Sequence, residues 1–214
     1  EVLAGPDFVP FGASELLSSA VRRGDLDAAV IASDGAGTLV TKNPVLIQGI
    51  GGRMSGLVKT SPIPEVIARI EENGGVVLDP ETAVIDQAAG VTLARTLGHR
   101  RIAVTTAVAA EATAIREQFP ETVIVAVHTT GISREDAALM AGAADLLTAC
   151  ASKHIREEAA KAALLQAGTS IPVFAMTRAG KAIILGKVLE TDQPFIIHGA
   201  HLPVPGSQSP EPLC

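Results

Sequence analysis

The chain has 214 residues, enough for one domain with a sizeable core and short for two. With 23 acidic against 17 basic residues, a net charge of −6 and no Trp or Tyr, its composition argues against a nucleic-acid-binding surface. Hydrophobic residues make up 47% of the chain, which excludes disorder, while the apolar runs are far shorter than the roughly 20 residues of a membrane helix. With no signal peptide visible, we expect a globular, cytoplasmic protein without a membrane partner.

The first third of the chain gives two predicted helices and one predicted strand. Ser14–Gly24 has helical spacing of apolar residues, and the continuous apolar run Ala28–Ala32 is typical of a strand that is buried on both faces. Residues 33–60 are rich in Gly and Thr and show no clear pattern. A second helix is predicted over Pro62–Asn73, with Ser61 as its N-cap.

The rest of the chain alternates more regularly between strands and helices. The further predicted strands cover residues 76–78, 101–105, 123–127, 146–149 and 173–176. The further predicted helices cover residues 86–98, 109–118, 134–141, 153–167 and 178–189. Ser133 with Asp136 forms a capping box before one of these helices, and Thr177 is the predicted N-cap of the last.

This alternation predicts an α/β protein with an open, doubly wound, Rossmann-like and mostly parallel sheet of about six strands. Six strands are too few for an eight-stranded barrel. We assign residues 1–202 to a single α/β domain. Residues 203–214, which contain four prolines, are predicted to form an extended tail.

Ligands of such sheets bind outside the carboxyl ends of the parallel strands, where the loops converge. The first notable polar residues after the six predicted strands are Ser33, Asp79, Thr105, His128, Cys150 and Thr177. Because the strands are predicted to be parallel, we expect these residues to lie along one edge of the sheet.

Three side chains at this edge are candidates for catalysis. His128 could transfer a proton. Cys150 opens a predicted helix beside Lys153 and His154, a setting that favours a reactive thiolate, although a cysteine at a strand end can also be a small buried hydrophobe. Asp34 follows the first strand and could contact a ligand hydroxyl group or a divalent ion.

Two glycine-containing segments are candidates for ligand binding. Gly35, Gly37 and Thr38 belong to a loop that could either approach a ligand closely or form a tight turn. Residues 48–56 contain four glycines, whose backbone N–H groups, together with Arg53, could hold a phosphate or carboxylate. The alternatives for this second segment are a hinge or a close helix crossing.

The anion site predicted in residues 48–56 consists of Gln48, Gly51, Gly52 and Arg53. Asp79 in a Leu-Asp-Pro turn could contact a hydroxyl group or magnesium, and Ser152, Lys153 and His154 follow the fifth strand as further ligand contacts. His198 and His201 have a ligand-like spacing but no Cys or carboxylate companion, so we expect no metal site. No cofactor can be named from these patterns.

Several longer strings of residues carry a family resemblance. They are residues 34–38 (DGAGT), 45–56 (with QGIGGR), 60–67 (TSPIPEVI), 78–83 (LDPETA) and 148–157 (TACASKHIRE). Through these strings, residues 11–188 resemble the family called methanogenesis marker protein 8. The resemblance implies a setting in methanogenic archaea and their relatives, in one-carbon or coenzyme metabolism, without an established reaction. Members of this family often carry a cysteine where this chain has Ser33, and a longer, cysteine-containing N-terminal region, so a cysteine-bound cluster is not expected to form here in the same way.

The sequence therefore predicts a protein that binds a small anionic metabolite, bearing a phosphate or carboxylate, at the carboxyl edge of its sheet. An enzyme is one possibility, and a non-catalytic maturation or assembly factor for a larger methanogenesis-related enzyme is the alternative. Convergence of the glycine segment with His128 and Cys150 in one cleft would favour the enzyme, and a flat glycine-rich surface the assembly factor. The mean hydropathy of +0.35 favours a homo-oligomer.

Overall fold

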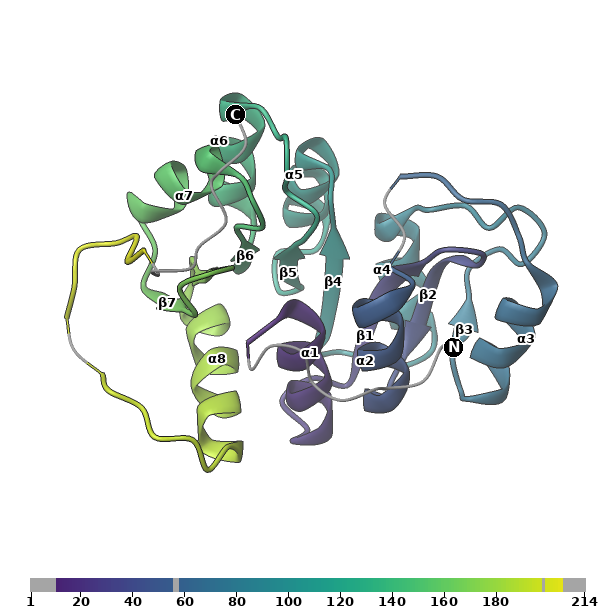
Figure 1. Cartoon of the computed structure of the whole chain (residues 1–214). Helices are drawn as coiled ribbons and strands as arrows, with labels where there is room; N and C mark the ends of the chain where they lie inside the picture. The colour runs from purple at the N-terminus through teal and green to yellow at the C-terminus, as the bar shows by residue number, and fades with distance from the viewer. Residues whose placement is uncertain (1–10, 56–57, 198, 206–214) are drawn as a thin grey trace.

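A computed structural model describes residues 11–55, 58–197 and 199–205, and within these ranges a single eight-stranded sheet is flanked by eight helices (Figure 1). The strands are β1 (Ala28–Ser33), β2 (Gly37–Thr41), β3 (Val76–Val77), β4 (Ile102–Thr106), β5 (Val123–Ala126), β6 (Leu146–Thr148), β7 (Leu165–Ala167) and β8 (Val173–Ala175). The helices are α1 (Ala13–Arg22), α2 (Pro44–Arg53), α3 (Pro64–Glu72), α4 (Gln87–Thr96), α5 (Ala109–Gln118), α6 (Arg134–Ala143), α7 (Lys153–Ala160) and α8 (Arg178–Glu190).

The strands are ordered β3-β2-β1-β4-β5-β6-β8-β7 across the sheet. The four central strands β1, β4, β5 and β6 are parallel to one another, as the alternation of strands and helices predicts. On one side β2 is antiparallel to β1 and β3 is antiparallel to β2, and on the other side β8 is antiparallel to β6 and β7 to β8. The α/β class is confirmed, but the prediction of a mostly parallel sheet of about six strands holds only for the centre of the sheet.

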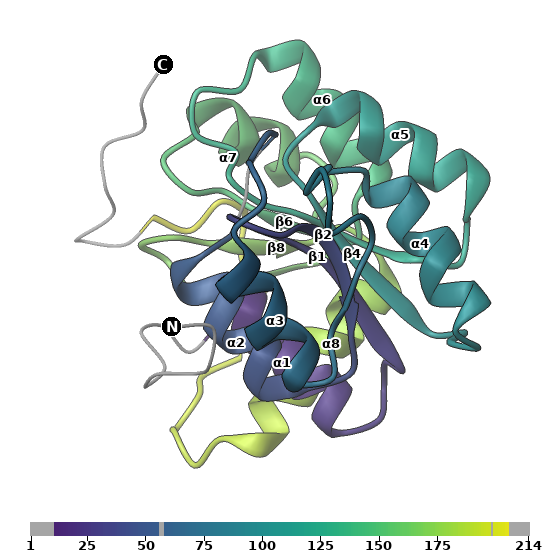
Figure 2. The ribbon, with the colours of Figure 1, turned by 90° about the vertical axis from the view of Figure 1, so that its right-hand side faces the viewer.

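Helices cover both faces of the sheet, as Figure 2 shows, with α1, α2, α3 and α8 on one side and α4 to α7 on the other. Successive side chains of β1 alternate between the two layers: Ala29 and Ile31 belong to the core under α1 and α2, and Ala28 and Val30 to the core under α4 and α5. Because both faces are covered, the strand reads as a continuous apolar run rather than an alternating one.

Two strands escaped prediction. β2 lies within residues 33–60, where Gly and Thr obscure the pattern, and a turn over residues 34–36 joins it to β1. β7 lies where the helix was predicted to continue to residue 167, whereas α7 ends at Ala160. Leu165 and Ala167 instead pair with Ala175 and Val173 of β8, a long-range pairing that helical spacing cannot reveal.

Two of the three predicted N-cap residues begin their helices as expected. Ser133 and Thr177 are confirmed as N-caps, accepting from the N–H groups of Asp136 and Gly180. The predicted cap at Ser61 is wrong, because α3 begins at Pro64, the second of the two prolines, with Ile63 as its N-cap.

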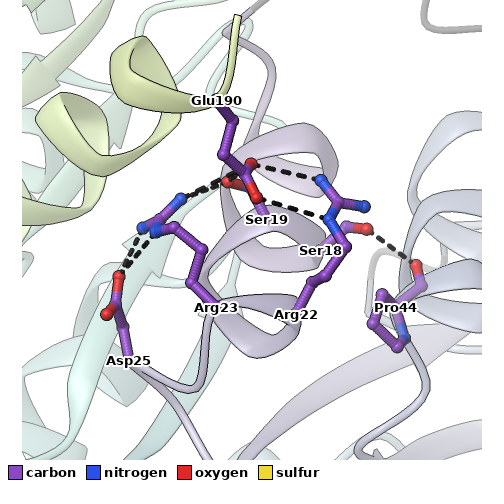
Figure 3. A network of polar contacts seen from close by, with 7 residues as sticks. All are labelled: Ser18, Ser19, Arg22, Arg23, Asp25, Pro44 and Glu190. Carbon is purple, nitrogen blue, oxygen red and sulfur yellow. Dashed lines mark hydrogen bonds and ion pairs between the residues drawn. The ribbon is translucent and has the colours of Figure 1, made fainter.

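A polar network ties α1 to the end of α8 (Figure 3). Glu190 accepts hydrogen bonds from Ser19 and from Arg22, the latter at 3.2 Å between Nη2 and Oε2. Arg23 donates to Ser19 and also forms an ion pair with Asp25. The last residue of α8 is thus fastened to the middle and end of α1.

Beyond α8 the chain runs back along the sheet. The side chain of Gln166 in β7 donates to the carbonyl oxygen of Val204 at 2.7 Å and accepts from its N–H at 2.8 Å. From residue 206 onward, the predicted tail lies outside the described residues, as does His198. Across the described ranges, no helix has the length and apolar character that crossing a membrane requires.

Candidate functional site

A cavity of about 320 Å³ opens at the carboxyl ends of the central parallel strands. The first turn of α1 and the last turns of α2 form one wall, and the ends of β1, β4, β5 and β6 form the other. Most of its lining is apolar, with Leu17, Ile31, Ile47 and Ile50 among the contributors. This volume lies at the lower end of the range that small-molecule sites occupy.

Four of the predicted site residues line this cavity. Gly51 and Gly52 come from α2, His128 follows β5, and Cys150 follows β6. Thr105 of β4 joins them, as its place at a parallel strand end predicts. Residues that are far apart in the sequence therefore meet in one cleft, the arrangement that favours an enzyme over a flat docking surface.

His128 and Cys150 share an unusual backbone conformation. His128 has φ of +54° and Cys150 has φ of +47°, both in the left-handed region that L-residues rarely adopt. Each conformation costs free energy, and such costs persist mainly at functional sites. Burial lowers the pKa of the His128 imidazole below its ordinary value of 6.5, so the ring is neutral at pH 7.

Ser55 is a site residue that sequence reasoning missed. Its Oγ lies 2.7 Å from Nε2 of His128, and both residues line the cavity. Ser55 reaches this position because its backbone forms an isolated bridge with Ser33 at the end of β1. Residues 33 and 55 are distant in the chain and belong to the stretch without clear periodicity. No local sequence pattern therefore predicts the contact between Ser55 and His128.

Glu15 is the second missed residue. It is 5% exposed, lines the cavity, and accepts hydrogen bonds from Gln48 Nε2 at 2.9 Å and from Ser14 Oγ at 3.0 Å. Gln48, predicted as a ligand contact, therefore holds Glu15 from behind the cavity wall. In the sequence, Glu15 is an acidic residue beside the apolar stripe of the first helix. A residue at such a position is usually interpreted as facing solvent, so its burial could not be predicted.

Near the cavity, two groups of polar atoms lack a hydrogen-bond partner among the described residues. Gly12, the N-cap of α1, has no side chain to cap the helix, and the N–H groups of residues 13–15 have no acceptor within the helix. Thr148 at the end of β6 is 9% exposed, and its buried Oγ1 has no hydrogen-bond partner in the described part of the chain. The N–H groups at the start of α1 could donate to a polar ligand group, whereas the Thr148 hydroxyl is too deeply buried for a ligand in the cavity to reach.

Most of the predicted anion loop, residues 48–53, lies in helix α2, and Gly56 lies outside the described residues. Residues up to Arg53 belong to α2, so their backbone N–H groups are engaged in the helix, and Met54 still donates to Ile50 at 2.8 Å. A Cβ at Gly51 would lie 2.4 Å from the Cβ of Ser14 in α1, so the structure shows the alternative, a close helix crossing. Arg53 is exposed and lies outside the cavity lining.

The loop after β1 is a tight turn of a hairpin rather than a wall of the cavity. Asp34 is exposed and accepts from Thr60 Oγ1, and Gly35 N–H donates to the same hydroxyl at 2.8 Å. Gly37 has φ of +69°, and a Cβ there would lie 2.3 Å from the carbonyl oxygen of Ala83. Packing within the fold thus accounts for these glycines.

Thr38 is buried at the start of β2 and is likewise engaged within the fold. Its hydroxyl donates to Gln87 Oε1 at 2.7 Å and accepts from the N–H of Asp86 at 2.9 Å. These bonds fasten the start of α4 to β2, and Thr38 does not reach the cavity lining.

The remaining predicted contacts also serve the fold. Asp79 closes its own turn by accepting from Thr82 Oγ1 at 2.5 Å and from the N–H of Glu81 at 3.0 Å, and these bonds lower its pKa. Ser152 is the N-cap of α7, Lys153 is exposed on that helix, and His154 is half-buried, both near Glu157. All of them lie outside the cavity lining.

The position of Thr177 differs from the prediction that the polar residues after all six predicted strands lie along one edge of the sheet. It follows β8, which runs antiparallel to β6, so it lies at the opposite edge of the sheet. There its hydroxyl donates at 2.6 Å to Asp145, the residue before β6. In the described ranges no group of three or more His, Cys, Asp or Glu side chains is placed to hold a metal ion.

Residues 1–189 match a family described as "Uncharacterized protein conserved in archaea (DUF2099)". The chain belongs to this family. A curated relative, "Uncharacterized protein MJ0054" of Methanocaldococcus jannaschii, is 44% identical over 208 residues, which cover 96% of this chain and 73% of the relative. No solved structure matches. The DUF2099 match extends over the whole cavity lining, from Gly12 to Cys150.

Proposed function

We propose that this protein binds a small metabolite carrying a carboxylate or phosphate group in the cavity at the carboxyl edge of its sheet, and acts on it as an enzyme. The observation that carries the proposal is the pair of left-handed residues, His128 and Cys150, which follow adjacent parallel strands and line the same cavity. Two strained, chemically capable side chains at one cavity favour a reaction site over a merely structural one.

The anionic group of the ligand would lie at the start of α1. The free N–H groups of residues 13–15 and the positive end of the helix dipole favour a negative charge there. The Glu15 carboxylate, to which Ser14 and Gln48 donate, lines the same cavity, and its like charge limits how close the anionic group can come to it. The apolar body of the ligand would contact Leu17 and Ile31.

The metabolic setting is part of the proposal. The resemblance to methanogenesis marker protein 8 favours a substrate from one-carbon or coenzyme metabolism. An assembly factor would need a docking surface, whereas the convergence of α2, His128 and Cys150 in one cleft supports an enzyme.

A pair of glycine substitutions tests whether the cavity is the binding site. A Cβ at Gly52 would meet nothing within 4 Å, so Gly52→Leu should fold and place a side chain at the cavity wall. Gly142 in α6 is equally open but remote, so Gly142→Leu is the matched control. Small molecules that copurify with the native protein would be identified by mass spectrometry and titrated calorimetrically into all three proteins, with inorganic phosphate and acetate as additional probes.

We expect Gly52→Leu to weaken binding at least about tenfold, which corresponds to about 1.4 kcal/mol, and Gly142→Leu to leave it unchanged. Equal affinities in the wild type and Gly52→Leu would place the ligand elsewhere and overturn the proposal.

A further inference from the structure

We propose that Ser55 and His128 form a nucleophile–base pair that transfers a small acyl group from an ester or thioester to water. This inference rests on the proposed function, since it requires a substrate in the same cavity, and it names the substrate class and the reaction. Nothing in the family description assigns a reaction to either residue.

The contact between the two side chains carries the inference. Ser55 Oγ and His128 Nε2 are 2.7 Å apart, within the distance at which a base can take a hydroxyl proton. With the ring proton on Nδ1, Nε2 accepts and the Ser55 hydroxyl donates. Ser55 is half-buried and His128 is exposed, and both line the cavity, so a ligand there can reach the serine oxygen.

The state of His128 suits a general base. Burial lowers the pKa of the imidazole, so the ring is neutral at pH 7 and can accept a proton. Its left-handed backbone, immediately beyond β5, fixes where the ring enters the cavity. Because Ala83 has the same conformation outside the cavity, the support for this role is that His128 lines the cavity and contacts Ser55.

Donors for the developing oxyanion border the same cavity. The N–H groups of residues 13–15 have no acceptor within α1, and these residues line the cavity. Such preorganised donors stabilise the negative charge that forms on a carbonyl oxygen under nucleophilic attack.

The reaction balances in two steps with water as the second substrate. In the first step Ser55 Oγ bonds to the acyl carbon, its proton moves to His128 Nε2, and the bond to the leaving alcohol or thiol breaks as that group takes the proton. In the second step water attacks the acyl carbon and gives a proton to His128. The bond to Ser55 Oγ then breaks, the serine recovers a proton, and the carboxylic acid leaves.

Cys150 is the competing nucleophile, since its thiol lines the same cavity. The geometry favours Ser55, because Ser55 holds the contact to the imidazole nitrogen. The test therefore distinguishes the two residues directly.

The experiment treats the purified full chain with diisopropyl fluorophosphate and maps the modified residue by peptide mass spectrometry. The wild type should gain one diisopropylphosphoryl group on Ser55, as the Oγ–P bond forms, fluoride leaves and His128 takes the proton. Ser55→Ala should lose this label, and His128→Gln should slow labelling about 100-fold or more, the usual contribution of a general base. Circular dichroism establishes that both variants are folded.

Two matched controls test whether the effects are local. Ser170 is exposed and His99 lies outside the cavity, so Ser170→Ala and His99→Gln should label at the wild-type rate. A burst of one equivalent of nitrophenol from p-nitrophenyl acetate, absent in Ser55→Ala, should accompany the labelling.

The outcomes separate this inference from the proposed function. Absence of label on Ser55 in the wild type, or modification of Cys150 instead, overturns the nucleophile–base pair. If calorimetry still detects ligand binding that Gly52→Leu weakens, the proposed function stands without this chemistry. If labelling of Ser55 requires His128 and the nitrophenol burst requires Ser55, the acyl-transfer pair is supported even where no copurified ligand is found.

Discussion

Two residues with left-handed backbones, His128 and Cys150, follow adjacent parallel strands. This conformation destabilises an L-residue by roughly 1–2 kcal/mol, whereas glycine adopts it without this cost. Neither position is occupied by glycine, although seven described glycines in this chain do adopt positive φ. Ala83 also has positive φ, at +52°, so the conformation alone does not mark a site; His128 and Cys150 differ from Ala83 in that both line the cavity.

Substitution of Cys150 measures the backbone cost directly. Cys150→Gly should be more stable than Cys150→Ala by about 1 kcal/mol, because only glycine relieves the left-handed strain. At the neighbouring Ala151, which lacks positive φ, Ala→Gly should instead lower stability by about 0.4–1 kcal/mol. Urea denaturation of the three variants and the wild type provides the comparison. Equal stability of the two Cys150 variants would mean that the backbone changes conformation on substitution.

His128 should make stability depend on pH in a defined window. Its folded-state pKa lies below the unfolded value of 6.5, so the unfolded chain binds more protons in this range and acid favours unfolding. Between about pH 7.5 and about pH 5, the free energy of unfolding should fall more steeply in the wild type than in His128→Gln. Parallel profiles for the two proteins would contradict this assignment. Carboxylates with lowered pKa values, such as Asp27 at about 2, act only at more acidic pH.

The catalytic candidates of the site were readable from the sequence, but their partners were not. His128 and Cys150 follow apolar runs, and a parallel sheet brings such strand ends together. Ser55 and Glu15 reach the cavity through a long-range bridge and a helix crossing, which leave no local pattern. The glycines of α2 favoured the prediction of an anion loop, because in a sequence a glycine needed for close helix packing looks the same as one needed for anion binding.

At the scale of elements, helix glycines separate into two kinds with opposite predicted effects. A Cβ at Gly180 in α8 would lie 2.1 Å from the carbonyl oxygen of Asp145, so this glycine allows α8 to approach the strand that begins one residue later. A Cβ at Gly142 in α6 would meet nothing within 4 Å.

Alanine at these two positions should therefore change stability in opposite directions. Gly180→Ala should cost about 1–3 kcal/mol through overpacking against backbone that cannot yield. Gly142→Ala should stabilise by up to about 1 kcal/mol, the helix propensity difference. Thermal unfolding followed by circular dichroism checks both. A stabilised Gly180→Ala would show that α8 can move away from the sheet without loss.

Elements with strong local signals were predicted well, and those defined by long-range pairing were not. The cap residues Ser133 and Thr177 and the buried run of β1 carry their own local information. The antiparallel strands β2 and β7 depend on partners elsewhere in the sheet, and β7 occupies a stretch whose composition also suits a helix. Because β8 runs antiparallel to β6, Thr177 lies at the edge of the sheet opposite the cavity.

At the scale of the whole molecule, the network around Glu190 joins the end of α8 to α1, the helix that also begins at the cavity (Figure 3). Although burial raises the pKa of Glu190, hydrogen bonds from Arg22 and Ser19 hold it below its ordinary value. The side chain of Arg22 is 55% exposed, so solvent screening limits the strength of this pair.

Salt should therefore weaken the link between the two helices. Glu190→Gln should lower the free energy of unfolding by no more than about 1 kcal/mol at low ionic strength. The difference from the wild type should shrink as salt is raised towards about 1 M, where the Debye length is about 3 Å. Chemical denaturation at several salt concentrations measures it, and a difference independent of salt would assign the effect to packing of the side chain.

The homo-oligomer favoured by the mean hydropathy stays a prediction. Light scattering on the purified chain at micromolar concentration checks it, and a monomeric mass would contradict it.

The two margins of the sheet constrain how any such partner could attach. β3 is two residues long and β7 is three, so neither offers a useful template for an incoming strand. Beside β7, the amide of Gln166 holds both backbone groups of Val204 and so occupies part of that margin with the chain itself. A second copy would therefore dock through side chains on the helical layers rather than by continuing the sheet from one molecule into the next. The short edge strands thus disfavour aggregation by edge-to-edge strand pairing.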